Sequence, residues 1–259
     1  MSVSAKVSAR ITAQLKKYQA VLKTAQKRDI SEADTVTIIT DMLADVFGYD
    51  KYKEVTSEHS IRGTSVDLAV TVDEKKRFLI EAKAINIELK DQHVKQAVDY
   101  AANEGISWVV LSNGAIWRLY CVRFSKPIDK TLVFEIDALN CDSKNDDVVA
   151  CFGSLTAEGY SKDNLADLLS EKQTSSKFTI AAVLRSEAMV EALRKEVRRL
   201  SGVRLEPDFL AALLENEIIK RELIDGDQGS DAVAYVKKLK RAAEKDKEPP
   251  IQASGAANG

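Results

Sequence analysis

The sequence predicts an α/β fold in which a mixed β-sheet is flanked by helices and followed by an all-helical carboxy-terminal extension. Three observations lead to this fold. Apolar residues recur at three- and four-residue steps over residues 3–48, which is typical of amphipathic helices. Between residues 53 and 136 the pattern changes to the two-residue period of strands, with one helical stretch inside it. Beyond about Ser154 only helical patterns remain.

Two helices are expected at the amino end. The first runs from about Val3 to Lys27, with a buried stripe of Val7, Ile11, Leu15, Tyr18 and Leu22. The second begins near Ser31, where Ser31 and Asp34 form a capping box, and ends at Gly48, which suits a left-handed C-terminal cap. Its apolar stripe consists of Val36, Ile39, Leu43 and Val46. One turn before Val36 lies Glu32, so this carboxylate is expected at the mouth of a buried face.

The middle of the chain predicts the sheet. Strands are expected at 54–61, 65–72 and 77–83, then a helix from about Lys90 to Asn103 that Gly105 ends. The segment from Ser107 to Val122 reads as two strands joined at Asn113-Gly114, a strong hairpin signal. Another strand is expected at 131–136. Trp108 and Trp117 fall on the hairpin strands and are expected to be core aromatics.

The last hundred residues predict helices at 162–172, 179–200, 207–224 and 231–245, with Pro207 in the first turn of the third. The tail from Glu248 has too little apolar content to fold. We therefore expect an α/β domain at 1–153, a helical extension at 154–247 and a disordered tail at 248–259.

Composition narrows the classes of function. The formal net charge is -2, so no global basic field indicates a nucleic-acid partner, although a local basic groove could still bind phosphates. Only two histidines, His59 and His93, are present, which disfavours a histidine-rich metal site or a Ser-His-Asp triad. Three widely spaced cysteines do not form the close pairs of zinc sites. Because no apolar run is long enough to span a membrane and no signal peptide is evident, we expect a cytoplasmic protein without a membrane partner.

The hairpin VDLAVTVDEKKRFLIEAK at residues 66–83 carries the candidate chemistry. If Asp67 lies opposite Glu81, one face becomes wholly apolar, with rows Val66–Ala82, Leu68–Ile80 and Val70–Phe78, and a slip of one residue would destroy that separation. Both carboxylates then share the other face, about 5 Å apart, with Lys83 one step further along. Opposed carboxylates repel, and Mg²⁺ is suited to lie between them, with the carbonyl of Ala82 as a further ligand. The alternative is that Lys83 simply neutralises both acids on a solvated face.

These residues, taken with their neighbours, resemble the PD-(D/E)XK nuclease superfamily, and within it the amino-terminal nuclease domain of type I restriction enzyme R subunits. The matching elements, in the family's order, are Glu32, Asp67 in VDLAV, EAK at 81–83, the Q-x-x-x-Y pair Gln96 and Tyr100, and VVLSNGAIWRLY at 109–120. They cover about Ser31 to Val122. Val66 stands where the family has proline. A Walker A motif (G-x-x-x-x-G-K followed by Ser or Thr) is absent from the sequence, so ATP-driven translocation would need another chain.

The resemblance implies a restriction-endonuclease-like sheet and a Mg²⁺-dependent DNA endonuclease, with Mn²⁺ as a substitute metal. It implies that Asp67 and Glu81 bind metal with support from Glu32, that Lys83 activates water, and that Gln96 with Tyr100 positions the DNA backbone or Lys83. The expected partners are DNA, a separate motor or specificity subunit, and a second copy of the chain. The alternative function is an idle nuclease-fold module for DNA binding or protein assembly.

Other polar residues have a structural interpretation beside a functional one. Asp34 competes with Glu32 as the helix carboxylate, but its place in the capping box favours a structural role. His59 lies on a strand before the cluster, where an ordinary surface histidine is the simpler interpretation. Two basic groups in the extension, at 194–204 and 237–241, could contact phosphates, although glutamates interleave the first of them.

Overall fold

The computed structural model describes residues 3–61, 64–160 and 164–245, and the side chains of 58–65 and 245 lie outside that description. Contacts divide the chain into two units, Met1–Leu169 and Ser170–Gly259, each of which is described by itself. The predicted domain limits at 153 and 247 stay predictions. The expected tail and the first residues of the expected 162–172 helix lie outside the described residues.

A six-stranded sheet, with its strands in sequence order, forms the centre of the first unit. The strands are β1 (Val55–Ile61), β2 (Thr64–Val72), β3 (Lys75–Ala82), β4 (Trp108–Ser112), β5 (Ile116–Arg123) and β6 (Asp129–Asp137). Each neighbouring pair is antiparallel except β3 and β4, which are parallel. A parallel pair needs a crossover connection, and helix α3 (Asp91–Glu104) lies within it. The sheet is therefore mixed, as predicted.

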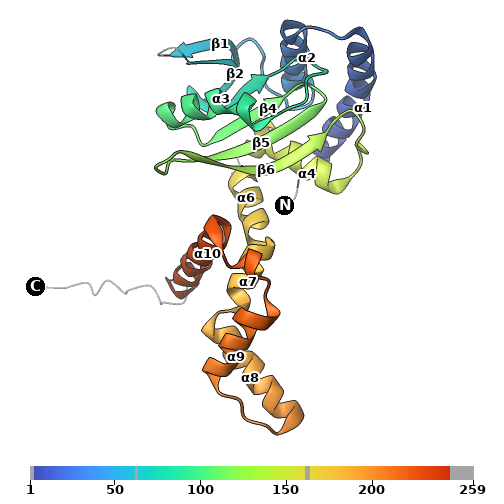
Figure 1. The fold of residues 1–259 in the computed structure, drawn as a ribbon. Coiled ribbons are helices and arrows are strands. Elements are labelled where there is room, and N and C mark those ends of the chain that lie inside the picture. Colours follow the sequence, from blue (N-terminus) through green and yellow to red (C-terminus); the bar gives the residue numbers. More distant parts are fainter. Residues whose placement is uncertain (1–2, 62–63, 161–163, 246–259) are drawn as a thin grey trace, which may run out of the picture. The chain divides into compact units, whose positions relative to one another are not determined.

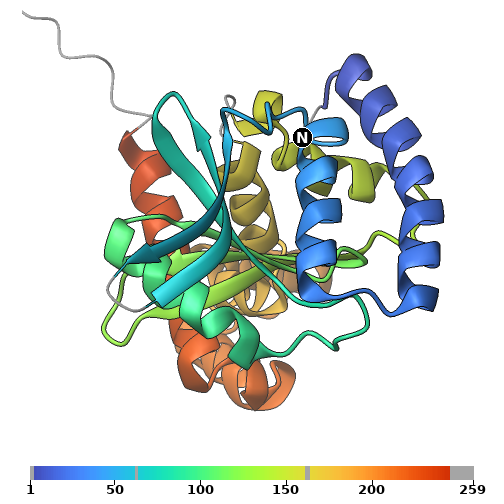
Figure 2. The same cartoon turned by 90° about the horizontal axis from the view of Figure 1, so that it is seen from above.

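Different helices cover the two faces of the sheet. On one face, side chains of α1 (Ala5–Arg28), α2 (Glu32–Asp45) and α4 (Asp146–Ser154) share a core cluster with Leu68, Phe78 and Trp117. Figures 1 and 2 both show α1 and α2 side by side. On the other face α3 packs on Leu79 and Leu111. The five residues predicted for the stripe of α1 are all buried, which confirms the periodicity argument.

Local signals at the ends of these elements are also confirmed. The hydroxyl of Ser31 accepts the backbone N–H of Asp34 at 3.2 Å and donates to its carboxylate at 2.9 Å, so the predicted cap of α2 forms. Gly48, beyond the end of this helix, has a φ of 83°, in the left-handed region where glycine is favoured. In the β4–β5 turn the side-chain oxygen of Asn113 accepts the N–H groups of Ala115 and Ile116, as turn asparagines commonly do.

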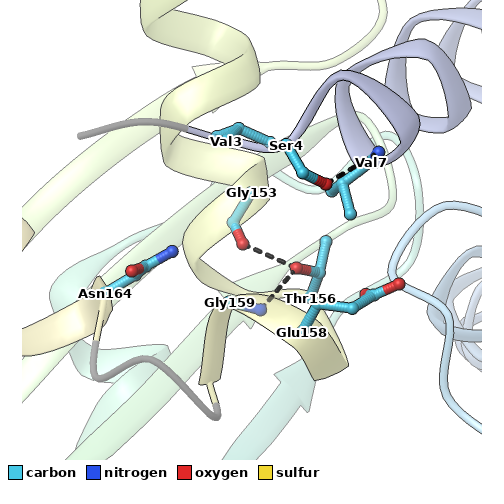
Figure 3. Close-up of a pocket in the computed structure, with 8 residues that line it drawn as sticks. All are labelled: Val3, Ser4, Val7, Gly153, Thr156, Glu158, Gly159 and Asn164. Carbon is cyan, nitrogen blue, oxygen red and sulfur yellow. Dashed lines mark hydrogen bonds between the residues drawn. The ribbon is translucent and has the colours of Figure 1, made fainter.

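The amino end of α1 lies against α4 and the short helix α5 (Ala157–Tyr160), around a cavity of about 20 Å³. In Figure 3 the hydroxyl of Thr156 donates to the carbonyl of Gly153 and accepts the N–H of Gly159. A Cβ at Gly159 would lie 2.0 Å from the carbonyl oxygen of Gly153, so this close approach requires glycine. The cavity has room for about one water molecule, which makes it a packing feature.

Short helices make up the second unit, with Leu210 and Leu214 in its core. After α6 (Asn164–Thr174), which crosses the division between the units, come α7 (Lys177–Leu184), α8 (Glu187–Ser201), α9 (Pro207–Leu213), a π-helical turn (Leu214–Ile218), a 3-10 turn (Arg221–Leu223) and α10 (Gly226–Lys245). None of the described helices has a stretch apolar and long enough to cross a bilayer.

The sequence predicts two long helices in this unit, and the structure interrupts both, so these predictions are wrong. The helix expected at 179–200 breaks at Ser186, whose extended backbone and carbonyl begin α8 by accepting the N–H groups of Met189 and Val190. Serine is a preferred N-cap residue, so a new helix begins here although the apolar period continues through the position. The helix expected at 207–224 ends when Ile219 becomes extended after the π-helical turn.

Candidate metal and nuclease centre

From Leu68 to Val70 the pairing of β2 with β3 follows the register that apolar patterning predicts, and beyond Val70 a bulge shifts it by one residue, to Thr71 opposite Lys76. Leu68 lies opposite Ile80 and Val70 opposite Phe78, and all four side chains are buried in the core under α1 and α2. The pairing of the two strands ends at Leu68–Ile80; beyond it Glu81 lies beside Leu111 of β4, which packs in the cluster under α3. The predicted pairing of Asp67 with Glu81 stays a prediction. Val66 is the exception, because it packs in the cluster on the α3 face. It lies beyond the last pair of β2 with β3, although it still pairs with His59 of β1.

Two backbone hydrogen bonds hold the end of β3 from opposite sides. The N–H of Ala82 donates to Oδ2 of Asp67 at 2.7 Å, so an acidic side chain of β2 takes the place of a backbone acceptor. The next N–H, of Lys83, donates to the carbonyl of Ser112 on β4 at 2.9 Å. The segment Glu81–Lys83 is therefore attached to both neighbouring strands at the position of the candidate site residues.

The ammonium group of Lys83 lies where the oxygen atoms of this cluster converge. Its Nζ donates to Oε1 of Glu81 at 2.8 Å and to the carbonyl of Ala82 at 2.7 Å. Oε2 of Glu32, at the first turn of α2, is 3.6 Å away. The side chain of Glu81 is only 10% exposed and that of Glu32 is 48% exposed. The structure thus brings Glu32, Glu81, Ala82 and Lys83 together, with Asp67 bonded to the same backbone segment.

Burial and charge act on the pKa values of this cluster in different directions. Burial raises the pKa of Glu81, and the negative charges of Asp67 and Glu32 raise it further, against the hydrogen bond from Lys83. Burial alone would lower the pKa of Lys83, but the hydrogen bond to Glu81 and the surrounding carboxylates outweigh that effect and raise it. Lys83 is therefore an ammonium ion at neutral pH and balances part of the negative charge.

The donor set suits a hard divalent cation. Asp67 and Glu81 offer carboxylates and Ala82 a carbonyl, and Mg²⁺ binds to such oxygen atoms while keeping several waters. Within the described residues, no group of three or more His, Cys, Asp or Glu side chains is arranged to hold a metal ion. A site here would therefore consist of two acidic side chains, a carbonyl and water, and Lys83 would have to release Glu81 and Ala82.

The Q-x-x-x-Y pair, Gln96 and Tyr100, lies in the middle of α3, with about one helical turn between the two residues. Gln96 is exposed, whereas Tyr100 is buried, with 1% exposure. The hydroxyl of Tyr100 accepts a hydrogen bond from Lys76 at 3.0 Å, and Lys76 also donates to Glu104 at 3.2 Å. Tyr100 thus contacts a lysine of β3 other than Lys83, and the roles predicted for Gln96 and Tyr100 stay predictions.

Most of the other polar and aromatic residues considered in the sequence have structural roles. Asp34 belongs to the cap of α2. The backbone of His59 pairs with Val66, and its side chain lies outside the described residues. Trp117 is a core residue, with no exposed surface and with Nε1 donating to the carbonyl of Gly114 at 2.8 Å. The three cysteines are free thiols.

The basic runs of the second unit divide into two kinds. On α8, Arg194 pairs with Glu191 at 2.7 Å and Arg199 with Glu196 at 2.6 Å, so two guanidinium groups are already engaged by the interleaved glutamates. On α10 the side chains of Lys237, Lys238, Lys240 and Arg241 are exposed. Phosphate binding by either run stays a prediction.

Sequence reasoning missed the residues that fasten the segment between Lys83 and α3. Asn86 donates to the carboxylate of Asp29 at 2.7 Å, and Asn113 donates to the carbonyl of Ile87 at 3.0 Å. Arg118 donates to the carbonyl of Leu89 at 2.8 Å. The asparagines carry an ordinary turn signal, which indicates local conformation but not a distant partner. Nothing in the sequence pattern distinguishes Arg118 from a solvated arginine of a strand.

Comparison with known proteins supports the family resemblance of the segment that contains the cluster. A family model described as type I restriction enzyme R protein N terminus (HSDR_N) matches residues 38–135. The matched range contains Asp67, Glu81, Lys83 and the Q-x-x-x-Y pair, and Glu32 precedes it. Searches of curated proteins and of solved structures gave no match. Over residues 38–135 the chain is therefore similar to the N-terminal domain family of type I restriction enzyme R proteins, as its motifs predict.

Proposed function

We propose that this protein is a metal-dependent DNA endonuclease of the PD-(D/E)XK type, which hydrolyses phosphodiester bonds with Mg²⁺. The observation that carries the proposal is the convergence of Glu81, the Ala82 carbonyl and Lys83 beside Asp67 at the end of β3. This cluster lies within the segment similar to a restriction enzyme family. Acidic ligands next to a fixed ammonium group suit a reaction in which negative charge develops on phosphate oxygens.

In this proposal Asp67, Glu81 and the Ala82 carbonyl hold the metal, and Glu32 supports the site. A bound Mg²⁺ supplies Lewis-acid polarisation of the phosphate and a more acidic bound water. Lys83 donates hydrogen bonds from Nζ, either to the attacking water, which it orients, or to the phosphate oxygens. The attachment of β3 to β2 and β4 holds these groups in place, since catalytic efficiency depends on small differences in position.

Further parts of the proposal concern the cell and the partners. DNA is the proposed substrate, Mn²⁺ a substitute metal, and the cytoplasm the proposed location. Because a Walker A motif is absent from the sequence, a separate motor or specificity subunit is a proposed partner for any coupled translocation. Self-association of the chain is a further proposal, which light scattering would test.

Nicking of supercoiled plasmid DNA tests the proposed activity. With Mg²⁺ the wild-type protein should convert supercoiled to open-circle DNA, and Lys83→Ala should slow this conversion by about a hundredfold or more, the usual effect of losing one electrostatic catalytic group. Lys75→Ala is the matched control, because Lys75 lies on the same strand with an exposed side chain. Equal nicking by wild type and Lys83→Ala would remove Lys83 from the mechanism.

A second function is favoured by one feature of the cluster. Lys83 already bonds Glu81 and the Ala82 carbonyl, so the chain supplies its own cation, as an idle nuclease-fold module for DNA binding or assembly would. Calorimetric titration with Mn²⁺ separates the two functions. Binding that Asp67→Asn abolishes would count against the idle module, and the absence of binding to the wild type would count against the nuclease.

A further inference from the structure

A polar hollow of about 220 Å³ lies beside the candidate centre in the first unit. The segment after Lys83, the β4–β5 turn, the segment after β6 and the end of α1 form its wall. The nearest lining residue in sequence is Ile85, two positions after Lys83, and the lining residue Asn113 follows Ser112, whose carbonyl holds the Lys83 N–H. A group entering the hollow would therefore lie next to the proposed site of cleavage.

The chemistry of the wall selects the kind of ligand. Its polar side chains are amides and carboxylates, namely Gln26, Asn86, Glu88, Asn113, Asp137 and Asn140. Among the described residues that line it there is no lysine or arginine, so a phosphate group would meet repulsion without compensation. Ile85, Ile116 and Leu139 supply apolar surface. A flat, neutral ring with hydrogen-bond donors on its edge fits this combination.

Internal hydrogen bonds hold the polar wall in place. Asp137 accepts the N–H groups of Leu139 and Asn140 through Oδ1, both at 3.0 Å, and the side-chain amide of Asn140 through Oδ2 at 2.9 Å. A carboxylate has about four acceptor positions, so Oδ2 keeps capacity for a ligand. The side chain of Glu88 is 85% exposed, and the distance from its Oε2 to Nζ of Lys90 is 3.9 Å, which is longer than a hydrogen bond. Acceptors thus outnumber donors among the groups open to a ligand.

Ile87 gives the rim of the hollow an exposed apolar side chain, with 45% exposure. Its backbone is held on both sides, because its N–H donates to the carbonyl of Ala84 at 2.9 Å and its carbonyl accepts from Asn113 at 3.0 Å. An apolar side chain on a fastened segment can enter between bases and unstack them, as isoleucine and leucine wedges do in proteins that deform DNA.

We propose that this hollow receives an extrahelical base of the DNA, one that carries an exocyclic amino group, while Ile87 fills the space it leaves. The inference rests on the proposed function, since it requires DNA at the neighbouring centre. Carboxylates accept hydrogen bonds from the amino group of cytosine, and amide side chains pair with adenine. Thymine has no exocyclic amino group and would leave the acceptors unpaired. Bases that are already unpaired are the least costly to extrude.

Fluorescence anisotropy with short labelled duplexes tests this, using Ca²⁺ in place of Mg²⁺ to prevent cleavage. The duplexes are fully paired or carry one unpaired adenine, cytosine or thymine. We expect the unpaired adenine and cytosine duplexes to bind about tenfold more tightly than the thymine duplex, within the range for base-edge recognition. Equal affinity for the three bulged duplexes would overturn the base pocket but leave the nuclease intact. Failure to bind any duplex would remove the proposed function and this inference together.

Three variants and one free nucleoside test which residues cause the base preference. Glu88→Gln should reduce the preference for the amino-bearing bases, and Ile87→Ala should weaken binding of the bulged duplexes. Ile128→Ala is the matched control, since Ile128 is 44% exposed on a different segment. An unchanged preference in Glu88→Gln, or an equal loss in Ile128→Ala, would overturn the assignment. Displacement of fully paired DNA by free deoxyadenosine would assign the hollow to a free nucleoside and also overturn it.

Discussion

Replacing Lys83 by methionine tests whether the acidic cluster needs a cation. Lys83 makes two hydrogen bonds with the segment it neutralises, one of them to the carboxylate of Glu81. A hydrogen bond to a charged group contributes about 1.5–3 kcal/mol, and the side chain of Lys83 is 20% exposed, which weakens the interaction somewhat. We therefore expect Lys83→Met to lower the free energy of unfolding by about 2 kcal/mol in the absence of metal.

Magnesium should reverse this loss, because it would meet the carboxylates without competition from the ammonium group. At a concentration about 100 times its Kd, a ligand that binds only the folded state adds about 2.7 kcal/mol. Urea unfolding of the wild type and of Lys83→Met, with EDTA and with Mg²⁺, measures both effects. Lys75→Met controls for the loss of a surface lysine.

Two results would refute the reasoning. Lys83→Met could unfold at the wild-type urea concentration in EDTA, in which case the carboxylates do not require the ammonium group. Alternatively, Mg²⁺ could leave the variant unchanged, in which case the acids do not attract a divalent cation. In Glu81→Gln the same lysine replacement should cost less, because the neutral amide no longer needs a positive partner.

Three further predictions concern the fold. Trp117→Ala should lower the free energy of unfolding by about 3–5 kcal/mol, because a side chain with no exposed surface is lost from the core, and urea unfolding measures it. Gly159→Ala should destabilise because its Cβ would lie 2.0 Å from a backbone oxygen, and a thermal midpoint equal to the wild type's would contradict this. The hydrogen bond from Arg10 lowers the pKa of Glu158, so Arg10→Ala should destabilise the protein at pH 7, and the difference should narrow as the pH falls below about 4. Urea midpoints over that pH range would show whether the difference narrows.

The sheet and its register could be predicted because one face of the β2–β3 hairpin is apolar. A single row such as Leu68 opposite Ile80 excludes the neighbouring registers in that part of the hairpin. The bulge after Val70 has no signal in the apolar pattern. The start of α2 could be predicted for a similar reason, since Ser31 and Asp34 satisfy the cap within four residues of sequence.

What sequence reasoning missed depends on contacts between distant residues. Arg118 and Leu89 are 29 positions apart, and their hydrogen bond exists because the crossover brings the start of α3 over β5. The bond between Tyr100 and Lys76 has the same origin. In the second unit, the break at Ser186 reflects competition between a good helix start and a continuing apolar period, which a periodicity argument alone does not decide.

The double attachment of β3 also bears on motions slower than any catalytic step. Amide protons exchange with solvent only when their hydrogen bonds open, and the slowest belong to segments that open only with global unfolding. Since the amides of Ala82 and Lys83 are bonded toward different strands, fraying at one side of β3 leaves the other amide closed. Their deuterium uptake should accordingly be slow at both positions, so the cluster would persist through the local openings that loosen the sheet's outer strands.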